Sequence, residues 1–578
     1  MIITRPELRT TPAVALSPRR WANDVDAMSE GQLDVLIVGG GIVGAGAALD
    51  AASRGLRVGI VEAQDWASGS SSRSSKLIHG GLRYLEMFDF ALVREALHER
   101  AVLLEVAPHL VHPTAFLYPL RHRVWERCYV GSGVLVYDLL ARTARSTGGV
   151  PFHRQLSRRR ALELAPALRA ERLAGAVQYY DAQVDDARHT LAVLRTAASF
   201  GAFVANRVCV TSLVRHGRRV SGVRVRLTET GEEREIRATV VVSATGVWTE
   251  SFEALAAETP ALALRPSKGV HLVVRRAAVA SSCALIIPTE KSVLFVLPWG
   301  EHWLVGTTDT AWPFDRARPA ASAADVDYLL TEANRVLSVP LRRADIESVY
   351  VGLRPLIAGA GEETTKLSRE HAVGRPAPGL IAVSGGKYTT YRIMARDAID
   401  AAIDHGGLRA PKSATDRVAI IGAAGFANRW AERARLARVR GSSLETYERL
   451  LRRYGSLVDE LATLEAADPS LAEPLRAAPG YLRSEIVYAV THEGARHLED
   501  VLARRTRATL DAPGRGLEAI EEIAALMQSP LGWDELTTRR EIEDVRTQVE
   551  SEQLAELDPD DATADATRTR TAPLLALP

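Results

Sequence analysis

Residues 33–62 read LDVLIVGGGIVGAGAALDAASRGLRVGIVE. Leu33 to Val38 is a short apolar run with several β-branched residues, which predicts a buried parallel strand. Glycines at the spacing G-x-G-x-x-G follow it directly, then an alanine-rich segment that favours a helix, then a second apolar strand that ends at Glu62. This order of strand, glycine turn, helix and strand is typical of a dinucleotide-binding βαβ unit.

The three glycines of this unit have separate mechanical roles. We expect Gly39 to make the tight turn, Gly41 to let the backbone approach a pyrophosphate, and Gly44 to let helix and strand pack closely. The helix N-terminus then faces the phosphates with unpaired N–H groups and the positive end of its dipole. Glu62, at the end of the second strand, would accept hydrogen bonds from the ribose hydroxyls.

Two later stretches bear on which dinucleotide is bound. Residues 240–248, VVVSATGVW, predict an apolar strand that ends in a glycine turn. Residues 380–391, LIAVSGGKYTTY, again run from a strand through two glycines to the start of a helix. Judged singly, each is also explained as one more strand–turn–helix unit of an α/β sheet. Together with Glu62 they indicate one large cofactor touched from three parts of the chain, which favours FAD.

The stretch AQDWASGSSSRSSKLIHGGLRYL, residues 63–85, resembles the flavin-phosphate and active-site loop of the FAD-dependent (aerobic-type) sn-glycerol-3-phosphate dehydrogenases. By composition alone its serine run would pass for a flexible linker. Further motifs match the family in the same order. They are VDDAR (184–188), SKGVH (267–271), VLPW (296–299), GTTD (306–309), GLRPL (352–356) and GGKYTTY (385–391). The resemblance covers roughly residues 31–410.

The resemblance implies that hydroxyl and N–H groups of the serine run wrap the pyrophosphate, and that residues 76–79 run beside the flavin ring. Combined with the glycine pattern, it predicts a set of FAD contacts. They are Gly39, Gly41, Ile42, Val43, Gly44, Glu62, Ala63, Ser71, Ser72, Ser74, Lys76, Leu77, His79, Val208, Gly246, Gly385, Gly386, Lys387, Tyr388 and Thr389.

The resemblance also implies a substrate, sn-glycerol 3-phosphate, which is oxidised to dihydroxyacetone phosphate. A phosphate calls for fixed cations, and the planar fork of arginine donates two parallel hydrogen bonds to its oxygens. The family motifs single out Arg83, Arg354 and Arg369, and Tyr84 is expected to contact the substrate beside Arg83. Any other arginine of this Arg-rich chain is better interpreted as a solvated surface residue.

Hydride transfer to the flavin requires a base for the hydroxyl proton. Histidine suits this role because its unperturbed pKa is ~6.5. We favour His79, which follows the flavin-wrapping loop; His271 is the alternative, as base or phosphate ligand. Lys387 is expected to neutralise the reduced ring or the alkoxide. Arg83 and Arg354 complete the predicted catalytic set.

Charge and cysteine content exclude several classes of function. Lys and Arg number 72 against 71 Asp and Glu, so there is no basic excess of the kind that a nucleic-acid partner usually requires. Three widely spaced cysteines form no C-x-x-C, which argues against a disulfide framework or a metal site and for a cytoplasmic protein. The longest apolar run, Val35 to Leu49, is short of the ~20 residues of a membrane span.

The electron acceptor is the least determined property. The sequence has no second glycine fingerprint for NAD, no haem motif and no cysteine cluster, which leaves oxygen, a soluble carrier or a quinone. Residues 118–140 combine arginines with Trp125 and an apolar stretch, and such a segment suits the inner membrane surface as well as an ordinary surface helix. The resemblance favours peripheral attachment and a quinone. The alternatives are an oxidase that makes peroxide and a non-catalytic flavin-binding interaction protein; a homo-oligomer stays open.

The predicted fold class is α/β, with a two-dinucleotide-type Rossmann-like FAD domain, an antiparallel β substrate domain and a helical C-terminal domain. The two first domains are interleaved over residues 31–415. Their segments are 31–115, 180–260 and 345–410 for FAD, and 116–179 and 262–344 for the substrate. We expect a flexible extension over 1–30, helices over 416–557, and a disordered tail over 558–578, where composition is of low complexity.

Overall fold

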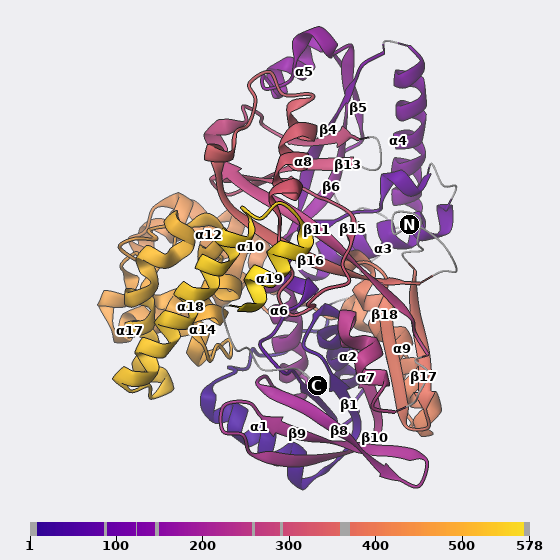
Figure 1. Cartoon of the computed structure of the whole chain (residues 1–578), viewed down its shortest axis with the longest axis vertical. Coiled ribbons are helices and arrows are strands. Elements are labelled where there is room, and N and C mark those ends of the chain that lie inside the picture. Colours follow the sequence, from indigo (N-terminus) through magenta and orange to yellow (C-terminus); the bar gives the residue numbers. More distant parts are fainter. Residues whose placement is uncertain are drawn as a thin grey trace.

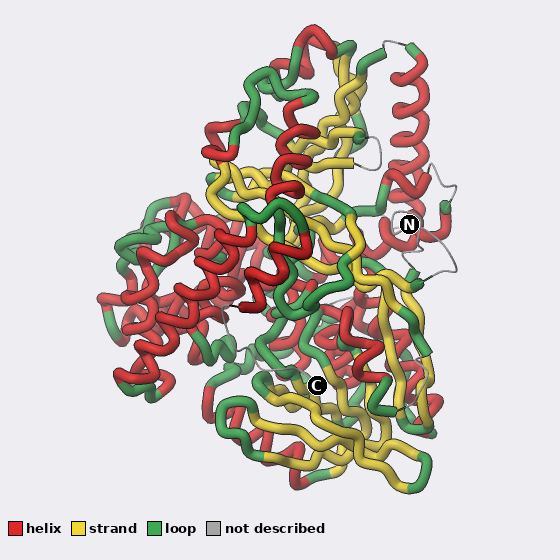
Figure 2. The backbone as a smooth tube through the Cα atoms, viewed as in Figure 1, coloured by secondary structure: helices red, strands yellow, loops and turns green. Residues whose placement is uncertain are grey.

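The computed structural model describes residues 8–85, 89–122, 124–144, 150–256, 261–289, 293–358 and 370–570. Two β-sheets and a separate group of helices make up the molecule (Figure 1). In the view of Figure 2 one sheet lies above the other, and the helical group lies to their left. This arrangement confirms the predicted α/β fold with a Rossmann-like domain, a second β domain and a helical C-terminal domain.

The first sheet has eight strands and contains the glycine-rich unit. Its order is β17-β18-β10-β1-β2-β7, with β9 beside β10 and β8 beside β9. The strands are β1 (Gln32–Val38), β2 (Val58–Val61), β7 (Phe203–Ala205), β8 (Val208–His216), β9 (Arg219–Leu227), β10 (Glu233–Ser243), β17 (His371–Ala377) and β18 (Leu380–Gly385). Because β18, β10, β1 and β2 run parallel, their carboxyl ends meet at one edge, which is where open α/β sheets bind ligands.

Three helices cover one face of this sheet: α2 (Ile42–Ser53), α6 (Asp186–Ser199) and α9 (Tyr391–Gly406). The small residues of α2 let its neighbours approach closely, since a Cβ added to Gly46 would lie 2.9 Å from the Tyr391 ring. This tight packing holds α2 against α9.

The second sheet has ten strands and is mainly antiparallel. Its order is β15-β11-β14-β13-β12-β4-β6-β3, with β16 beside β11 and β5 beside β6. The strands are β3 (Leu77–Ile78), β4 (Val111–Leu120), β5 (Arg154–Ser157), β6 (Gly175–Val184), β11 (Leu264–Arg275), β12 (Ala284–Pro288), β13 (Val293–Trp299), β14 (His302–Gly306), β15 (Thr310–Ala311) and β16 (Ile346–Ile357). β13 and β14 pair as the hairpin that the apolar pattern predicts.

The predicted boundaries of the two interleaved domains need correction. β16 pairs with β11 along its length, so it belongs to the second sheet and not to the FAD-domain segment 345–410. β3 and the first half of β4 also join the second sheet, although they fall within the predicted FAD-domain segment 31–115. The apolar pattern of a strand shows that it is buried, but not which sheet it joins.

The helical domain follows a connection that ends near residue 425. Its main helices are α10 (Phe426–Ala431), α11 (Arg433–Arg440), α12 (Leu444–Tyr454), α13 (Val458–Ala467), α14 (Arg483–Thr491), α17 (Ile520–Leu531) and α18 (Glu535–Ala555). They enclose two apolar cores of their own. A π-helix, Val501–Thr506, projects from this domain toward the first sheet and ends at Arg507.

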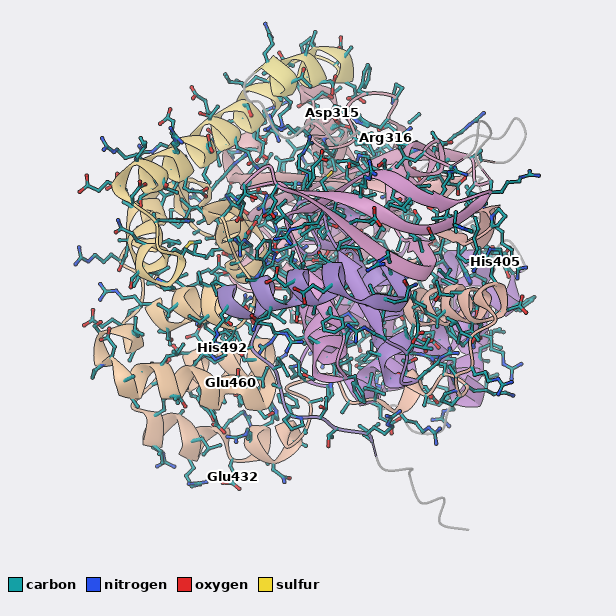
Figure 3. The ribbon with its side chains drawn as sticks, turned by 90° about the horizontal axis from the view of Figure 1, so that it is seen from below. Asp315, Arg316, His405, Glu432, Glu460 and His492 are labelled. Carbon is teal, nitrogen blue, oxygen red and sulfur yellow. The ribbon has the colours of Figure 1, made fainter. Side chains whose placement is uncertain are left out.

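The prediction of a flexible extension over 1–30 is wrong for residues 18–30, which form helix α1 (Pro18–Glu30). Ser17 caps α1, and Val25 and Met28 are buried under the first sheet. Before α1 the chain crosses the helical domain, where the N–H of Leu16 donates to the carbonyl of His492. His492 is labelled there in Figure 3. These residues are ordered because they contact both the first sheet and the helical domain. The composition of the segment does not reveal this role.

The prediction of a disordered tail over 558–578 is wrong for α19 (Asp561–Arg570). Arg568 donates to the Ser551 hydroxyl at 2.5 Å, and Asp561 pairs with the buried ammonium of Lys268 at 2.6 Å. α19 is a polar helix that ion pairs to distant elements hold in place. Because its stability comes from those partners, its own sequence resembles that of a disordered segment.

No helix among the described residues is long and apolar enough to cross a membrane. Other helices lie outside the helical domain and apart from the three that cover the first sheet. They include α3 (Phe90–Val106), α4 (Trp125–Ala144), α5 (Arg158–Leu164), α7 (Thr249–Glu253) and α8 (Ala323–Asn334).

His497→Gln should destabilise the protein most at mildly acidic pH. Burial opposes the charge on His497, but its contacts with Glu229 (3.5 Å) and Glu541 (2.7 Å) outweigh it and raise the pKa of His497 to about 9. The stabilisation is therefore complete below the unfolded pKa of ~6.5 and is lost as pH rises through about 9. Urea unfolding should be measured for wild type and His497→Gln across this pH range. Their free energies of unfolding should converge as pH rises through about 9.

His492→Gln is the control, since burial lowers the pKa of His492 and its contribution has the opposite pH dependence. A difference between wild type and His497→Gln that stays constant with pH would contradict the assignment of the raised pKa.

Candidate active site

One cavity lies where the carboxyl ends of β1, β10 and β18 meet β11 and β16 of the second sheet. Most of the predicted FAD contacts line it. They are Gly39, Gly41, Ile42, Val43, Glu62, Ala63, Ser71, Ser74, Leu77, His79, Val208, Gly246, Gly385, Gly386, Lys387, Tyr388 and Thr389. The three stretches that favour FAD in the sequence therefore do converge on one space, and they reach it from three parallel strands.

The glycine turn leaves room for a phosphate at the start of α2. Gly39 has a φ of +112°, and a Cβ added to Gly44 would lie 1.9 Å from the carbonyl oxygen of Gly39. Gly41 caps α2 without a side-chain hydrogen bond, and the Ser71 hydroxyl accepts the N–H of Ile42 at 2.9 Å. A helix N-terminus that lines the cavity beside serine hydroxyls suits a pyrophosphate, so these residues fit a dinucleotide.

Glu62 holds the backbone around the turn as well as lining the cavity. Its Oε2 accepts the N–H of Gly40 at 2.6 Å, and its Oε1 accepts the N–H of Gln64 at 2.8 Å. Burial raises the pKa of Glu62 above its ordinary value, while the two backbone hydrogen bonds oppose this shift. A ribose hydroxyl would join an acceptor that is already fixed in place.

Glu62→Ala should release the dinucleotide because both the ribose acceptor and the two backbone anchors are lost. We expect the purified variant to carry much less FAD per chain than wild type after gel filtration, with denaturation of wild type releasing FAD and not FMN. Glu62→Gln, which keeps an acceptor oxygen, should retain an intermediate amount. Wild-type FAD content in Glu62→Ala would contradict the role of Glu62.

Three predicted FAD contacts, Gly44, Ser72 and Lys76, do not line the cavity. Gly44 acts through close packing, as its spacing predicts. The side chain of Lys76 is fully buried, and its Nζ donates to Asp186 Oδ1 at 2.9 Å and to the carbonyl of Ser72 at 3.1 Å. Burial, together with the Arg507 cation, lowers the pKa of Lys76 to about 8. Lys76 therefore supports the backbone of residues 72–76, here called the serine loop, from the side that does not face the cavity.

His79 and the GGKYTTY segment meet on one side of the cavity. The N–H of His79 donates to the Thr389 hydroxyl at 3.1 Å, and that hydroxyl donates to the carbonyl of His79 at 3.3 Å. Lys387 lines the cavity beside them, at the start of the turn that leads into α9. The structure thus brings His79 to the segment that contains Lys387 and Thr389, and Thr389 is 310 residues further along the chain.

His271, on β11, faces the cavity from the second sheet. A hydrogen bond of 2.9 Å joins its Nε2 to the Ser75 hydroxyl, and its ring stacks on Tyr350 with 4.7 Å between centroids. Burial, and then the Arg354 cation, lowers the pKa of His271 well below its ordinary value, so the imidazole is neutral at neutral pH. The sequence did not predict Ser75 and Tyr350, because neither type of residue marks such a contact.

Arg354, on β16, also lines the cavity and is held by the GTTD motif. It donates to the Thr307 hydroxyl at 3.1 Å and to the carbonyl of Thr308 at 3.3 Å, and Asp309 lies at 3.7 Å. A Cβ added to Gly269 would lie 2.6 Å from Nη2 of Arg354, so a larger residue there would displace the guanidinium from this position. The guanidinium is therefore oriented before any anion arrives.

The other three predicted substrate contacts have side chains outside the part of the chain that the structure describes. Arg83 and Tyr84 lie in the short helix Leu82–Leu85, directly after the cavity-lining His79, and their side chains are outside the described part. Arg369 lies outside the described residues altogether. Among the described residues no group of His, Cys, Asp and Glu could hold a metal ion.

Residues 34–397 match the model of the FAD-dependent oxidoreductase family, and residues 413–538 match the C-terminal domain of alpha-glycerophosphate oxidase. The chain is 50% identical over 558 residues to a "Glycerol-3-phosphate dehydrogenase 2" of Mycobacterium tuberculosis, which covers 96% of this chain and 95% of that protein. It is 36% identical to the human mitochondrial glycerol-3-phosphate dehydrogenase, over 92% of this chain and 75% of the relative.

Solved structures agree with these matches. The glycerol-3-phosphate dehydrogenase of Bacillus halodurans, complexed with FAD, superposes with a TM-score of 0.75 at 30% identity, over 92% of this chain and 98% of that one. The L-alpha-glycerophosphate oxidase of Mycoplasma pneumoniae shares the fold, with a TM-score of 0.52 at 17% identity over 66% of this chain and 97% of that one.

Proposed function

The chain belongs to the FAD-dependent oxidoreductase family and has FAD as its cofactor, and on this premise we propose that it oxidises sn-glycerol 3-phosphate to dihydroxyacetone phosphate. The observation that carries the proposal is the meeting of Arg354, His79 and His271 on the cavity that contains the dinucleotide cradle. A fixed guanidinium suits the phosphate, and an imidazole suits the proton of the hydroxyl.

FAD held by the glycine turn, Glu62 and the serine hydroxyls would supply the acceptor for the hydride that leaves carbon 2 of the substrate. The chain must bind the phosphate, orient carbon 2 and remove the hydroxyl proton. Arg354 anchors the phosphate with an orientation preset by Thr307 and Thr308. Lys387, which lines the cavity from the first sheet, stabilises the negative charge that develops as the proton leaves. Arg83, Tyr84 and Arg369 remain proposed substrate contacts.

His79 is the proposed base, because it lines the cavity beside Lys387 and Thr389. His271 is a second candidate for a specific reason. Its lowered pKa keeps it in the neutral form that a base requires, and its buried Nδ1 has no hydrogen-bond partner in the part of the chain that the structure describes.

The proposed reaction is tested by adding sn-glycerol 3-phosphate anaerobically to the purified holoprotein and recording its absorbance. The oxidised-flavin absorbance should bleach, and dihydroxyacetone phosphate should form in amounts equal to the flavin. Glycerol, which lacks the phosphate, is the control and should bleach the flavin very slowly. Flavin that glycerol 3-phosphate leaves oxidised would favour a non-catalytic flavin-binding protein.

We further propose that the electrons pass to a quinone at the inner face of the cell membrane. Helix α4 lies at one edge of the molecule in Figure 1, with Val134 and Tyr137 buried against its neighbours. It exposes Trp125 (61%), Tyr129 (54%) and Leu139 (51%), an aromatic and apolar face typical of helices at a lipid surface. The match of residues 413–538 to an oxidase domain supports oxygen as the other candidate acceptor.

Two measurements separate these acceptors. The double variant Trp125→Glu, Leu139→Glu should no longer float with anionic vesicles, whereas Val439→Glu, Leu557→Glu, on exposed positions of the helical domain, should still float. Reduced enzyme should pass electrons to a quinone analogue faster than to oxygen. Stoichiometric peroxide from a protein that binds no vesicles would establish the oxidase.

A further inference from the structure

The two aspartates of the VDDAR motif, at the start of α6, face the helical domain. Asp185 Oδ1 accepts from Nη2 of Arg507 at 2.7 Å and from its Nε at 3.1 Å. Asp186 Oδ1 accepts from the same Nη2 and from Lys76 Nζ, the latter at 2.9 Å. The side chains of Asp186 and Lys76 are fully buried and that of Arg507 is 2% exposed, so these charges depend on contacts within the protein and not on water.

The cluster of Asp185, Asp186, Lys76 and Arg507 anchors the serine loop on the side that does not face the cavity. Asp186 Oδ2 accepts from the N–H of Ser74 at 2.9 Å and from its hydroxyl at 2.7 Å. The carbonyl of Ser72 accepts from Arg507 Nη1 and from Lys76 Nζ, both at 3.1 Å. The backbone of residues 72–76 is therefore fixed by one side chain of α6, one of the loop itself and one of the helical domain.

The opposite side of the same loop lines the cavity. Ser74 and Ser75 both line it, and the hydroxyl of Ser75 bonds to His271. The hydroxyl of Tyr350, which stacks on His271, donates to the carbonyl of Ser74 at 3.0 Å. A displacement of the loop backbone would move the groups that face the cofactor and the imidazole together.

Arg507 itself is held firmly. It follows the π-helix, with a φ of +110°, and its Nη1 also donates to the carbonyl of Ala503 at 3.2 Å. Arg453, on α12, donates to the carbonyls of Arg505 and Thr506 at 2.5 and 3.0 Å. The helical domain thus presents this guanidinium from a braced backbone.

We infer that Arg507 is a positioning residue. Through it the helical C-terminal domain holds the serine loop and, by way of Ser75, the imidazole of His271. The consequence for FAD retention follows from the cofactor alone, whereas the consequence for His271 rests on the proposed function. The inference gives the VDDAR motif a role, which is to dock the helical domain behind the cofactor.

The first test compares Arg507→Met with Arg195→Met. Arg195, on α6, is also 2% exposed and contacts Tyr488 and Glu460 of the helical domain. Within the described residues its hydrogen bonds go to these two side chains and to the carbonyl of Val14, and not to the serine loop. Both variants remove a buried cation of the same interface and should lose similar stability. FAD should dissociate about tenfold faster or more from Arg507→Met than from Arg195→Met, and Arg507→Lys should restore part of the difference. Equal dissociation rates would overturn the inference.

The second test is a double-mutant cycle on the rate of flavin reduction by glycerol 3-phosphate at saturating FAD. Arg507→Lys and Ser75→Ala should be strongly non-additive, whereas Arg195→Lys and Ser75→Ala should be additive. Additivity in both cycles would remove the link to His271. If wild-type flavin is not reduced at all, the proposed function fails, but the FAD dissociation rates still decide the anchoring role.

Asp185→Asn covers the case in which the Arg507 variants do not fold. Asn keeps an N-cap acceptor for α6, where Asp185 accepts the N–H of Arg188, but it removes one of the two carboxylate charges that hold Arg507. FAD should dissociate faster from this variant than from Arg195→Met, and an unchanged rate would contradict the inference.

Discussion

His79→Gln is expected to slow the reduction of bound FAD by glycerol 3-phosphate by about 10²–10⁴-fold, the usual contribution of a general base. The substitution removes the imidazole that lines the cavity beside Lys387, while the backbone contacts of residue 79 with Thr389 remain. FAD content should therefore stay close to that of wild type. Anaerobic stopped-flow measurement at saturating substrate gives the rate directly.

His271→Gln separates the two candidate bases, because glutamine can keep the hydrogen bond to Ser75. A larger loss in His271→Gln than in His79→Gln would assign the base to His271. The pH profile gives a second criterion. Burial and Arg354 lower the pKa of His271, so a rate that depends on its neutral form would persist as pH falls through ~6.5 and decline only below it.

Arg354→Ala should lower kcat/KM for glycerol 3-phosphate by roughly 10²-fold or more, equivalent to about 3 kcal/mol in transition-state binding. We take the lower end of the range for an unpaired charge because the Arg354 side chain is 23% exposed and water partly replaces it. The activity with glycerol should hardly change, since glycerol has no phosphate to lose. Steady-state kinetics with both substrates measures the difference.

Arg275→Ala is the matched control. Arg275 lies at the other end of β11, is 66% exposed and pairs with Glu347 away from the cavity. Its removal should leave kcat/KM nearly unchanged. If wild type used glycerol and glycerol 3-phosphate equally well, Arg354 would not be the phosphate anchor.

The parts of the fold that depend on neighbouring residues could be predicted well. The strand Gln32–Val38, the glycine turn and α2 follow from local hydrogen bonding and from the space that only glycine leaves at position 44. The strands at 240–243 and 380–385 were also recognisable, because each apolar run ends in a glycine turn. β10 pairs in parallel with β1, and β18 pairs in parallel with β10, which explains why three distant segments reach one cavity.

The errors have a common physical origin in long-range contacts. α1 and α19 are polar helices that are stabilised by other domains, so their composition suggests flexible ends. β16 looks like one more strand of the first sheet until its pairing with β11 is known. Lys76 falls within a cofactor motif but supports the loop from behind, through Asp186.

Sequence alone is sufficient for the cofactor class, the βαβ unit and the residue types expected at the site, because glycine geometry, strand pattern and motif spacing are local properties of the chain. Only the tertiary structure decides which side chains act together. Ser75 and His271 are 196 residues apart, and Asp186 and Arg507 are 321 apart. Such contacts form because buried ions and polar groups require partners, which come from whichever element packs beside them in the fold. The sequence pattern does not show which element that is.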